Sequence, residues 1–253
     1  MTINIRKLYF SPVKSISFTS SPNLHIQKDI GIKNDRIFAL TRKINKKKSI
    51  IFEKIPEKRN LHFFLTLRNS PFLNKYNFAI NKNLLIFKLN NEIITSINFN
   101  EETSYDSITK ELMKRENSIK ETYLIKNEKF PFFDTTPHNS ISLINLNSIA
   151  DFESKINKSI EYSRFRGNIY VNNLDPWEEF DYIGKNLIIN DCQFKVIGKI
   201  PRCSATNLPP NSTEIDINLP QKLRQTYNHI NMGIYLAPLN NGEISVNDKI
   251  RIE

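Results

Sequence analysis

The 253-residue chain contains two cysteines, Cys192 and Cys203, and Cys203 has the more informative neighbours. It lies in the run 199–206, which reads Lys-Ile-Pro-Arg-Cys-Ser-Ala-Thr. The guanidinium of Arg202 favours an ionised thiol, and a thiolate is both a nucleophile and a ligand for soft or high-valent metal centres. The run therefore predicts a nucleophile or a metal ligand at Cys203. The alternative is that Cys203 is a small buried apolar residue.

Three further stretches place basic and hydroxyl side chains next to turns. Lys14 and Ser15 follow the first strand-like segment, Asp35 and Arg36 open another, and residues 164–168 read Arg-Phe-Arg-Gly-Asn. Arginine offers paired N–H donors and hydroxyl groups add neutral donors, so such residues can build a pocket for a phosphate or a carboxylate. Each stretch taken by itself is also common on ordinary protein surfaces.

Short strand-like segments, bounded by Asn, Gly, Pro or Asp, must position these residues in the first half of the chain. They cover residues 3–9, 36–42, 61–67, 76–80, 84–89 and 92–99. The turns at 81–83 and 90–91 suit tight hairpins because asparagine tolerates left-handed backbone conformations. The first half is therefore predicted to be an antiparallel β unit.

The second half mixes strand-like segments with helical patterns. A helix is expected before it, at residues 104–118, where Ile108, Leu112 and Met113 recur at helical spacing. Further helices are expected at residues 148–157 and, after Pro220, at residues 221–229. Strand-like segments lie at residues 140–146, 168–171, 186–189, 194–199 and 243–252. We therefore expect a mostly β chain with a few helices (α+β), made of two β units in series with a boundary near residues 127–137.

Chain length and cysteine content indicate the cellular compartment of the protein. A chain of this length buries a core without disulfides, and two cysteines make no disulfide framework, which favours a reducing environment. The amino terminus lacks the continuous apolar core of a secretory signal, and no stretch approaches the ~18 apolar residues of a membrane span. We expect a soluble, cytoplasmic protein with no membrane partner.

The chain is basic, with a formal net charge of +10 and a pI near 9.5. Such a charge attracts polyanions, but lysine, asparagine and isoleucine are frequent throughout, which indicates a general compositional bias. The basic run 42–48 is predicted to be a solvated hairpin loop, with a surface that concentrates an anionic ligand as the alternative. Nucleic-acid binding is not expected, because Phe63, Phe64 and Phe78 alternate like core residues and no RNA-binding signature occurs.

Taken in order, these stretches resemble the MOSC family, the molybdenum cofactor sulfurase C-terminal domain, preceded by the β-barrel domain that often accompanies it. The matching runs are 9–15 (Tyr-Phe-Ser-Pro-Val-Lys-Ser), 31–36 (Gly-Ile-Lys-Asn-Asp-Arg), 133–137 (Phe-Asp-Thr-Thr-Pro), 143–149, 164–169, 177–179 (Trp-Glu-Glu), 200–206, 233–235 and 242–248. Gly167, where the family usually has proline, and Pro201 before Arg202 are departures. The resemblance implies a β-barrel-like N-terminal domain over 1–127, packed with a β-barrel MOSC domain over 128–253.

The resemblance also implies a cofactor and its ligands. In the family a pterin dithiolene holds molybdenum, and Cys203 matches the cysteine that supplies a further sulfur ligand to this molybdenum cofactor (Mo-molybdopterin). Cys203 and Arg202 would be the catalytic residues, and Asp35 would orient Arg36. Further contacts to the pterin phosphate or to the oxo groups of the metal would come from basic and polar side chains: Lys14, Ser15, Arg36, Arg166, Asn168 and Arg202.

The reaction implied is a two-electron reduction that removes oxygen from an N-hydroxylated compound, such as an amidoxime, a hydroxylamine or an N-hydroxylated base. No four clustered cysteines are present to hold an iron–sulfur group, so electrons are expected from a separate flavoprotein, flavodoxin or ferredoxin. An acidic donor could dock on the basic surface, and electron transfer would then weaken as ionic strength rises. His138 is not expected to be the proton donor, because histidine is as often a structural hydrogen-bonding residue.

A non-catalytic carrier is the alternative from another functional class. In such a protein Cys203 would hold a persulfide, or the cofactor itself, for transfer. The same cysteine serves both functions, so the sequence does not separate them, whereas turnover of a model N-hydroxylated substrate does.

Overall fold

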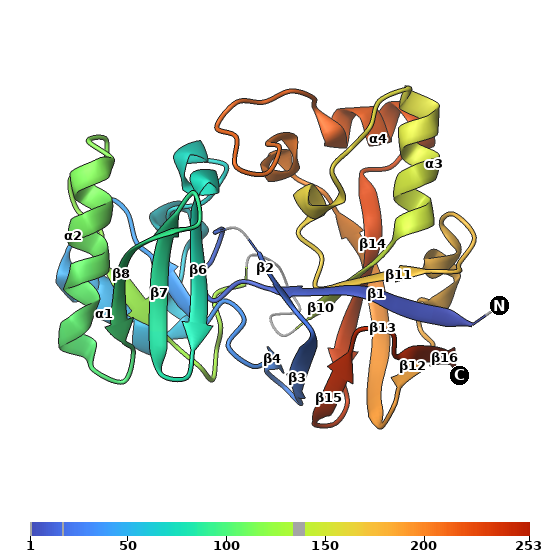
Figure 1. The fold of residues 1–253 in the computed structure, drawn as a ribbon, viewed down its shortest axis with the longest axis horizontal. Coiled ribbons are helices and arrows are strands. Elements are labelled where there is room, and N and C mark those ends of the chain that lie inside the picture. The colour runs from blue at the N-terminus through green and yellow to red at the C-terminus, as the bar shows by residue number, and fades with distance from the viewer. Residues whose placement is uncertain (1, 17, 134–139) are drawn as a thin grey trace. The chain divides into compact units, whose positions relative to one another are not determined.

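The computed structural model describes residues 2–16, 18–133 and 140–253, which form two compact units (Figure 1). Unit 1 comprises residues 1–10, 20–33 and 139–253, and unit 2 comprises residues 11–19 and 34–138. These units are defined by contacts in space, whereas the predicted division at residues 127/128 is a division along the chain and stays a prediction. Asp134 to Pro137 of the predicted Asp-x-x-Pro run, and His138, lie outside the described residues.

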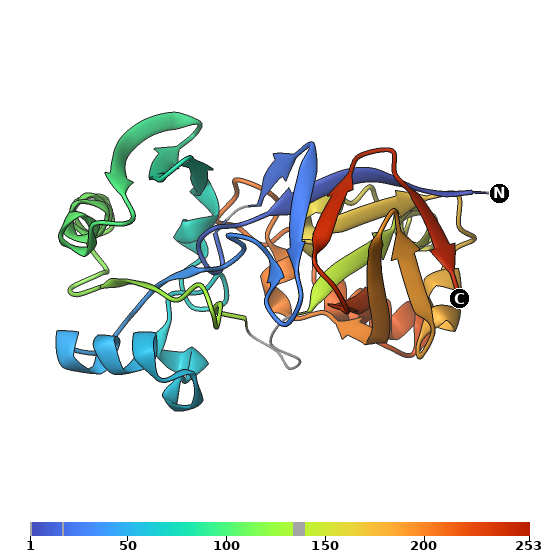
Figure 2. The ribbon, with the colours of Figure 1, turned by 90° about the horizontal axis from the view of Figure 1, so that it is seen from below.

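Unit 1 is built around a closed seven-stranded β-barrel with the strand order β11-β10-β14-β13-β12-β16-β1 (Figures 1 and 2). Pairing of β1 with β11 closes the ring, and the sheet continues past β1 to β2 (Thr19–Ser21). All barrel pairs are antiparallel except β10 with β11. The barrel strands are β1 (Ile3–Phe10), β10 (Ile141–Asn145), β11 (Ile169–Asn172), β12 (Asn186–Ile189), β13 (Cys192–Pro201), β14 (Asn231–Pro238) and β16 (Lys249–Ile252).

The barrel interior is filled by alternate residues of each strand, as the period of two in a pleated strand requires. In β13, Cys192, Phe194 and Val196 are buried, whereas Gln193 is exposed. β1 contributes Ile5, which pairs with Val171 of β11 and is fully buried. A strand from the amino terminus therefore completes a core that otherwise comes from the second half of the chain.

Two helices and several short elements complete unit 1. Helices α3 (Leu146–Ile156) and α4 (Leu219–Tyr227) pack together beside the barrel and share an apolar cluster that includes Phe152 and Leu223 (Figure 1). Asparagine side chains cap both helices at their first turn, and an asparagine in left-handed conformation ends each one. The other elements are β3 (Asn23–Gln27), β4 (Gly31–Ile32), β15 (Gly242–Ser245), η5 (Tyr162–Phe165), η6 (Glu178–Tyr182) and η7 (Ser204–Asn207).

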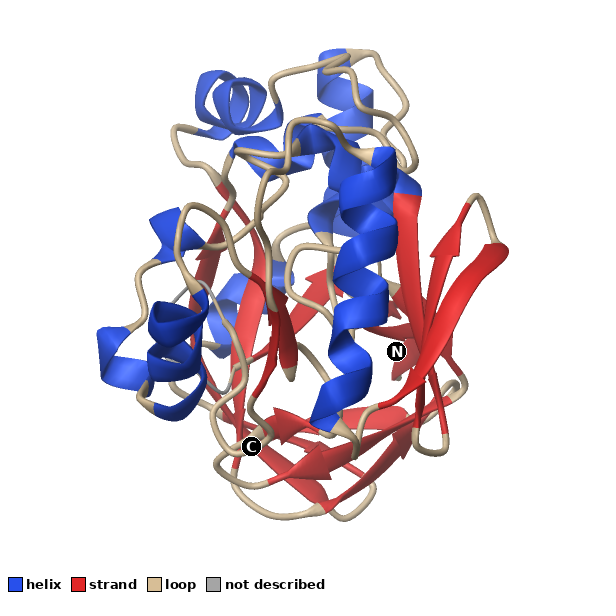
Figure 3. Ribbon diagram, turned by 90° about the vertical axis from the view of Figure 1, so that its left-hand side faces the viewer, coloured by secondary structure: helices blue, strands red, loops and turns tan. Residues whose placement is uncertain are grey.

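Unit 2 combines two small antiparallel sheets with two α-helices, which Figure 3 separates by colour. Helix α2 (Tyr105–Arg115) packs against β8 and β9. The helix buries Ile108 and Leu112, spaced one turn apart, as an amphipathic helix on a sheet must. The other elements are α1 (Lys46–Lys54), β5 (Phe38–Leu40), β6 (Tyr76–Asn81), β7 (Leu84–Leu89), β8 (Glu92–Asn98), β9 (Leu124–Lys126), η1 (Pro56–Lys58), η2 (Leu61–Phe63), η3 (Pro71–Lys75) and η4 (Glu102–Ser104).

The predicted fold class is confirmed: the described part of the chain is mostly β, with four α-helices and a closed barrel. The three predicted helices are present with ends that differ by a few residues. The hairpin at 90–91 has both asparagines left-handed, but in the hairpin at 81–83 the left-handed residue is Lys82. Among residues 2–16, 18–133 and 140–253, no helix combines the length and apolar character needed to cross a membrane.

Two predictions about unit 2 are wrong. Residues 61–67 are not a strand, because the Asn60 side chain accepts a hydrogen bond from the His62 amide (2.9 Å) and starts the short helix η2. The basic run 42–48 is not a hairpin loop, because it leads into helix α1. The Asn45 side chain caps that helix by accepting a hydrogen bond from the Lys48 amide (3.0 Å), and lysine is a good helix former.

Candidate functional site

Cys203 is exposed and stands at the turn between the end of β13 and the short helix η7. Its main-chain oxygen accepts hydrogen bonds from the amide (3.1 Å) and the hydroxyl (2.9 Å) of Thr206, which fix the turn. The alternative that Cys203 is a buried apolar residue is wrong. That description fits Cys192, which lies in the barrel core and whose thiol pKa is raised by burial.

The side chain of Arg202 points into the protein and donates hydrogen bonds to main-chain oxygens. Its Nε donates to Met232 (2.9 Å), its Nη1 donates to Phe165 (2.7 Å), and its Nη2 also donates to Met232. Burial lowers the pKa of this guanidinium, because the charged form loses its hydration. Arg202, the residue before Cys203, is therefore bonded to strand β14 and to the end of η5. Its predicted contact with a cofactor stays a prediction.

A second buried arginine, Arg164 of η5, holds the other side of the same turn. Its Nε donates to the main-chain oxygen of Thr206 (3.0 Å), and its Nη2 donates to that of Asn207 (2.6 Å). The guanidinium also forms an ion pair with Asp216 (2.5 Å), which lowers the pKa of that carboxyl. The Asn207 side chain in turn accepts from the amide of Leu219, at the start of α4.

The two arginines therefore bracket the exposed thiol. Arg202 anchors the turn before Cys203, and Arg164 anchors it after Cys203. Both anchors involve η5, because Arg164 belongs to it and Arg202 donates to its last residue, Phe165. A charged donor shared among main-chain oxygens restricts the backbone more than neutral bonds do. The chain thus presents one accessible thiol on a fixed turn.

Arg166 directly follows η5 and ends it in a left-handed conformation (φ 53°), with its side chain half-buried. Gly167 comes next, where a Cβ would lie 2.6 Å from Cδ1 of Ile144, so any larger residue would have to displace that side chain. The amide of Gly167 donates to the hydroxyl of Tyr170 (2.9 Å). This close packing fixes the main chain next to Arg166.

Asn168 is fully buried and joins three barrel strands. Its Oδ1 accepts from the hydroxyl of Ser142 (2.8 Å), and its Nδ2 donates to the main-chain oxygen of Tyr9 (3.1 Å). The main-chain amide of Tyr9 donates back to Asn168 (2.8 Å). In this geometry Asn168 positions the chain next to Arg166, and its predicted contact with a cofactor stays a prediction.

The other predicted site residues, Lys14, Ser15 and Arg36, belong to unit 2. Lys14 is buried and its Nζ donates to the main-chain oxygen of Phe132 (3.1 Å), while Ser15 adopts a left-handed conformation (φ 63°). Asp35 holds Arg36 through an ion pair of 2.9 Å, the orienting arrangement that the sequence predicted. The structure thus places Arg166, Asn168, Arg202 and Cys203 on unit 1 and these three residues on unit 2.

The guanidinium of Arg36 is flanked by two aromatic rings, those of Phe18 and Phe133, each 4.9 Å away. Arginine binds well to such faces because its planar cation is weakly hydrated. The buried carboxylate of Asp35 also accepts from the amide of Ser11 (2.8 Å). Arg36 is therefore a preorganised cation that keeps 17% of its side-chain surface exposed.

The motif Trp177-Glu178-Glu179 has a structural position that its sequence did not reveal. Glu179 is fully buried and accepts hydrogen bonds from the Ser148 hydroxyl (2.9 Å) and from Nδ2 of Asn145 (3.1 Å). Burial raises the pKa of Glu179 to about 6, although these bonds favour the charged form. Trp177 donates to Asp151 of α3 (2.7 Å). The motif therefore fastens η6 to α3.

Sequence reasoning missed the role of Arg164, which it read only as part of a basic motif. The available signal was its pairing with Asp216, but 52 residues separate the two and no local pattern links them. Among the residues that the structure describes, no group of three or more His, Cys, Asp and Glu side chains could hold a metal ion. Cys203 would therefore bind a metal centre as a single thiol ligand.

Residues 133–251 match the family model of the MOSC domain. This matched segment contains most of the closed barrel together with η5, the Cys203 turn and α4. Residues 133–251 of the chain are accordingly similar to the MOSC domain.

Two curated relatives match part of the chain. The chain is 30% identical over 107 residues to mitochondrial amidoxime reducing component 2 of Rattus norvegicus, and 28% identical over 104 residues to the protein of the same name from Bos taurus. The matches cover 42% and 41% of this chain and 30% of each relative. The chain thus matches less than a third of the length of these relatives.

Two solved structures are similar at low identity. The YuaD protein from Bacillus subtilis gives a TM-score of 0.48 at 13% identity, covering 100% of this chain and 96% of that one. YiiM from Geobacillus stearothermophilus gives a TM-score of 0.35 at 17% identity, covering 45% of this chain and 53% of that one.

Proposed function

We propose that the chain is an oxidoreductase that binds the molybdenum cofactor through Cys203. The observation that carries this proposal is the exposed thiol on a turn held from both sides by Arg202 and Arg164, inside a MOSC domain. Thiolate sulfur is a donor that such a metal prefers, and a pterin dithiolene supplies further sulfur ligands, so a single protein thiol is a fitting donor set. The residues present therefore fit the cofactor.

When bound, the cofactor supplies the two-electron redox chemistry. The protein's own contribution is to present the Cys203 sulfur in one position, because Arg202 and Arg164 fix the main chain on either side of it. Arg166 is a proposed contact for an anionic group of the cofactor. The family resemblance proposes the same role for Lys14, Ser15 and Arg36. The partial exposure of the Arg36 side chain and the half-buried side chain of Arg166 support this assignment.

The proposed reaction converts the N–OH group of an amidoxime, a hydroxylamine or an N-hydroxylated base into N–H. The substrate takes up two electrons and two protons, its N–O bond breaks, and the oxygen leaves as water. A separate flavoprotein, flavodoxin or ferredoxin is the proposed source of the electrons. The name of the rat and bovine relatives and the net charge of +10, which suits an acidic donor, support this proposal.

The test is expression in a host that makes the cofactor, followed by measurement of molybdenum and released pterin per chain. We expect both near one per chain in the wild type and a strong loss in Cys203→Ser. Cys192→Ala, which removes the other thiol, is the matched control and should keep both. Thermal unfolding followed by circular dichroism verifies that each variant is folded.

Turnover separates the enzyme from the carrier. With a chemical reductant, the loaded wild type should convert benzamidoxime to benzamidine, and Cys203→Ser should not. Loaded protein without turnover would favour a carrier that transfers the cofactor. Absence of both molybdenum and pterin in the wild type would contradict the proposal.

A further inference from the structure

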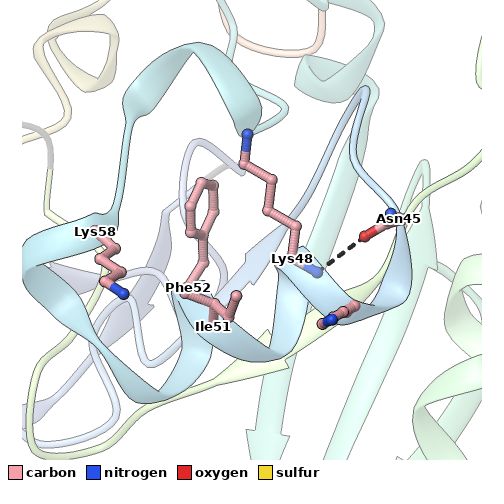
Figure 4. A pocket seen from close by; sticks show the side chains of 6 residues that line it. Asn45, Lys48, Ile51, Phe52 and Lys58 are labelled. Carbon is pink, nitrogen blue, oxygen red and sulfur yellow. Dashed lines mark hydrogen bonds between the residues drawn. The ribbon is translucent and has the colours of Figure 1, made fainter.

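On unit 2, helix α1 and the following η1 form a pocket of about 450 Å³ (Figure 4). A volume of this size falls in the range of small-molecule sites. The six residues that line it come from 14 consecutive positions of the chain: Asn45, Lys47, Lys48, Ile51, Phe52 and Lys58. The pocket and Cys203 belong to different units, so the inference does not depend on the proposed cofactor chemistry.

The lining pairs an apolar surface with positive charge. Ile51 and the ring of Phe52 provide the apolar part, and in Figure 4 the ring stands between the side chains of Lys48 and Lys58. The Nζ of Lys48 lies 3.8 Å from the centre of the Phe63 ring, so its charge rests on an aromatic face. A ligand that suits this lining is an anion with an apolar body.

The positive charge of the lining is not neutralised by carboxylates. In the part of the chain that the structure describes, no ion pair is recorded for Lys47, Lys48 or Lys58. Glu53 belongs to the same helix but accepts from the main-chain amide of Lys126 (2.8 Å). With Lys48 placed on the Phe63 ring, Lys47 and Lys58 are the two lining cations that an external anion can pair with.

The position of these lysines on α1 adds to the positive potential. The first turn of the helix contains Lys46, Lys47 and Lys48 and no acidic residue. Cations at this end are unfavourable because the amino terminus of a helix already carries partial positive charge. A bound anion would relieve this repulsion, whereas the apolar wall would hold its body out of water.

We propose that this pocket binds a small aromatic carboxylate. The ring of the ligand packs on Phe52 and Ile51, and its carboxylate meets the ammonium groups of Lys47 and Lys58. The aromatic body is inferred from the apolar wall, and the carboxylate is inferred from the positive charge of Lys47 and Lys58. The carboxylate accounts for selectivity over neutral ligands, and the ring accounts for selectivity over small anions.

The test is isothermal titration calorimetry of the full chain with 2-naphthoate. Two probes are matched to it: 2-naphthamide lacks the charge, and acetate lacks the ring. Saturable binding at one naphthoate per chain is expected, with weaker binding of both matched probes. A rise in ionic strength should weaken naphthoate binding, because exposed ion pairs are screened.

Lysine variants locate the binding. Lys47→Gln and Lys58→Gln are each expected to weaken naphthoate binding by about three- to fivefold, the effect of one exposed ion pair. Lys54→Gln changes an exposed lysine of the same helix that does not line the pocket, and it should leave the affinity within about twofold. All three lysines are exposed, so folding should be unaffected, as circular dichroism would verify.

Three results would overturn the proposal. The first is the absence of saturable binding of 2-naphthoate. The second is equal weakening by Lys54→Gln and Lys47→Gln, which would show a general charge effect. The third is 2-naphthamide binding as tightly as 2-naphthoate, which would leave the lysines without a role.

Discussion

The Nε of Arg164 donates a 3.0 Å hydrogen bond to the main-chain oxygen of Thr206, three residues after the exposed Cys203. The bond joins η5 to η7 across 42 residues of sequence. Together with the bonds from Arg202 to the oxygens of Met232 and Phe165, it anchors the Cys203 turn on both sides.

Replacing Arg164 should destabilise the fold and loosen the thiol. Arg164→Ala leaves the buried main-chain oxygens of Thr206 and Asn207 without their donor, and the expected loss in free energy of unfolding is about 2 to 4 kcal/mol. Denaturant unfolding measures the loss, and the alkylation rate of Cys203 in the native state measures the loosening. Arg164→Lys keeps the charge but not the paired donors and should give an intermediate effect. An unchanged alkylation rate in Arg164→Ala would contradict the anchoring role.

The two thiols should react at very different rates in the native protein. Cys203 is exposed, whereas Cys192 is buried in the barrel core with a raised thiol pKa, and only an accessible thiolate reacts. Alkylation with iodoacetamide followed by peptide mass spectrometry should label Cys203 first. Cys192 should react at a comparable rate only after unfolding in denaturant. Equal labelling under native conditions would contradict the burial of Cys192 in the barrel core.

Gly242 should tolerate no side chain while Cys192 is present. A Cβ at position 242 would lie 2.4 Å from the Cys192 sulfur, so Gly242→Ala forces core residues apart. The expected loss in free energy of unfolding is about 1 to 3 kcal/mol. In the double variant Gly242→Ala/Cys192→Ala the clash is absent, so adding Gly242→Ala to Cys192→Ala should cost much less. Strictly additive effects in this cycle would refute the contact.

Glu179 should make stability depend on pH. Its pKa in the folded protein is about 6, above the ordinary value of 4.5, so folding favours the protonated form. This contribution is fully present below pH 4.5 and is lost as pH rises through about 6, by roughly 2 kcal/mol. Glu179→Gln removes the titration. The difference in free energy of unfolding between variant and wild type should therefore shift by that amount in favour of the variant between pH 4 and pH 7. Curves of the free energy of unfolding against pH that run parallel for variant and wild type would contradict the raised pKa of Glu179.

The sequence predicted those parts of the fold that depend on local patterns. The alternation of residues 194–199 and the helical spacing of residues 104–118 each lead to the observed element, because side-chain periodicity is a local property. Barrel closure is different: Ile5 of β1 pairs with Val171 of β11, and no local signal relates them. The errors at 42–48 and 61–67 arose because single asparagine caps, at Asn45 and Asn60, decided the local structure.

The candidate site was predicted in part. The exposure of Cys203 agrees with the functional interpretation of the run 199–206. The direction of Arg202 could not be predicted, because a guanidinium beside a cysteine in sequence can turn outward to a ligand or inward to main-chain oxygens. Here it turns inward, and the anchoring partner Arg164 comes from a distant segment. Tertiary contacts of this kind are not encoded in a local motif.

The most direct test of the central claim is X-ray absorption at the molybdenum K edge on protein loaded in a cofactor-competent host. If the sulfur of Cys203 is a ligand, the wild type should show one more sulfur scatterer per bound molybdenum than the residual molybdenum in Cys203→Ser, and Cys192→Ala should match the wild type. An identical sulfur count in the wild type and Cys203→Ser would contradict the account.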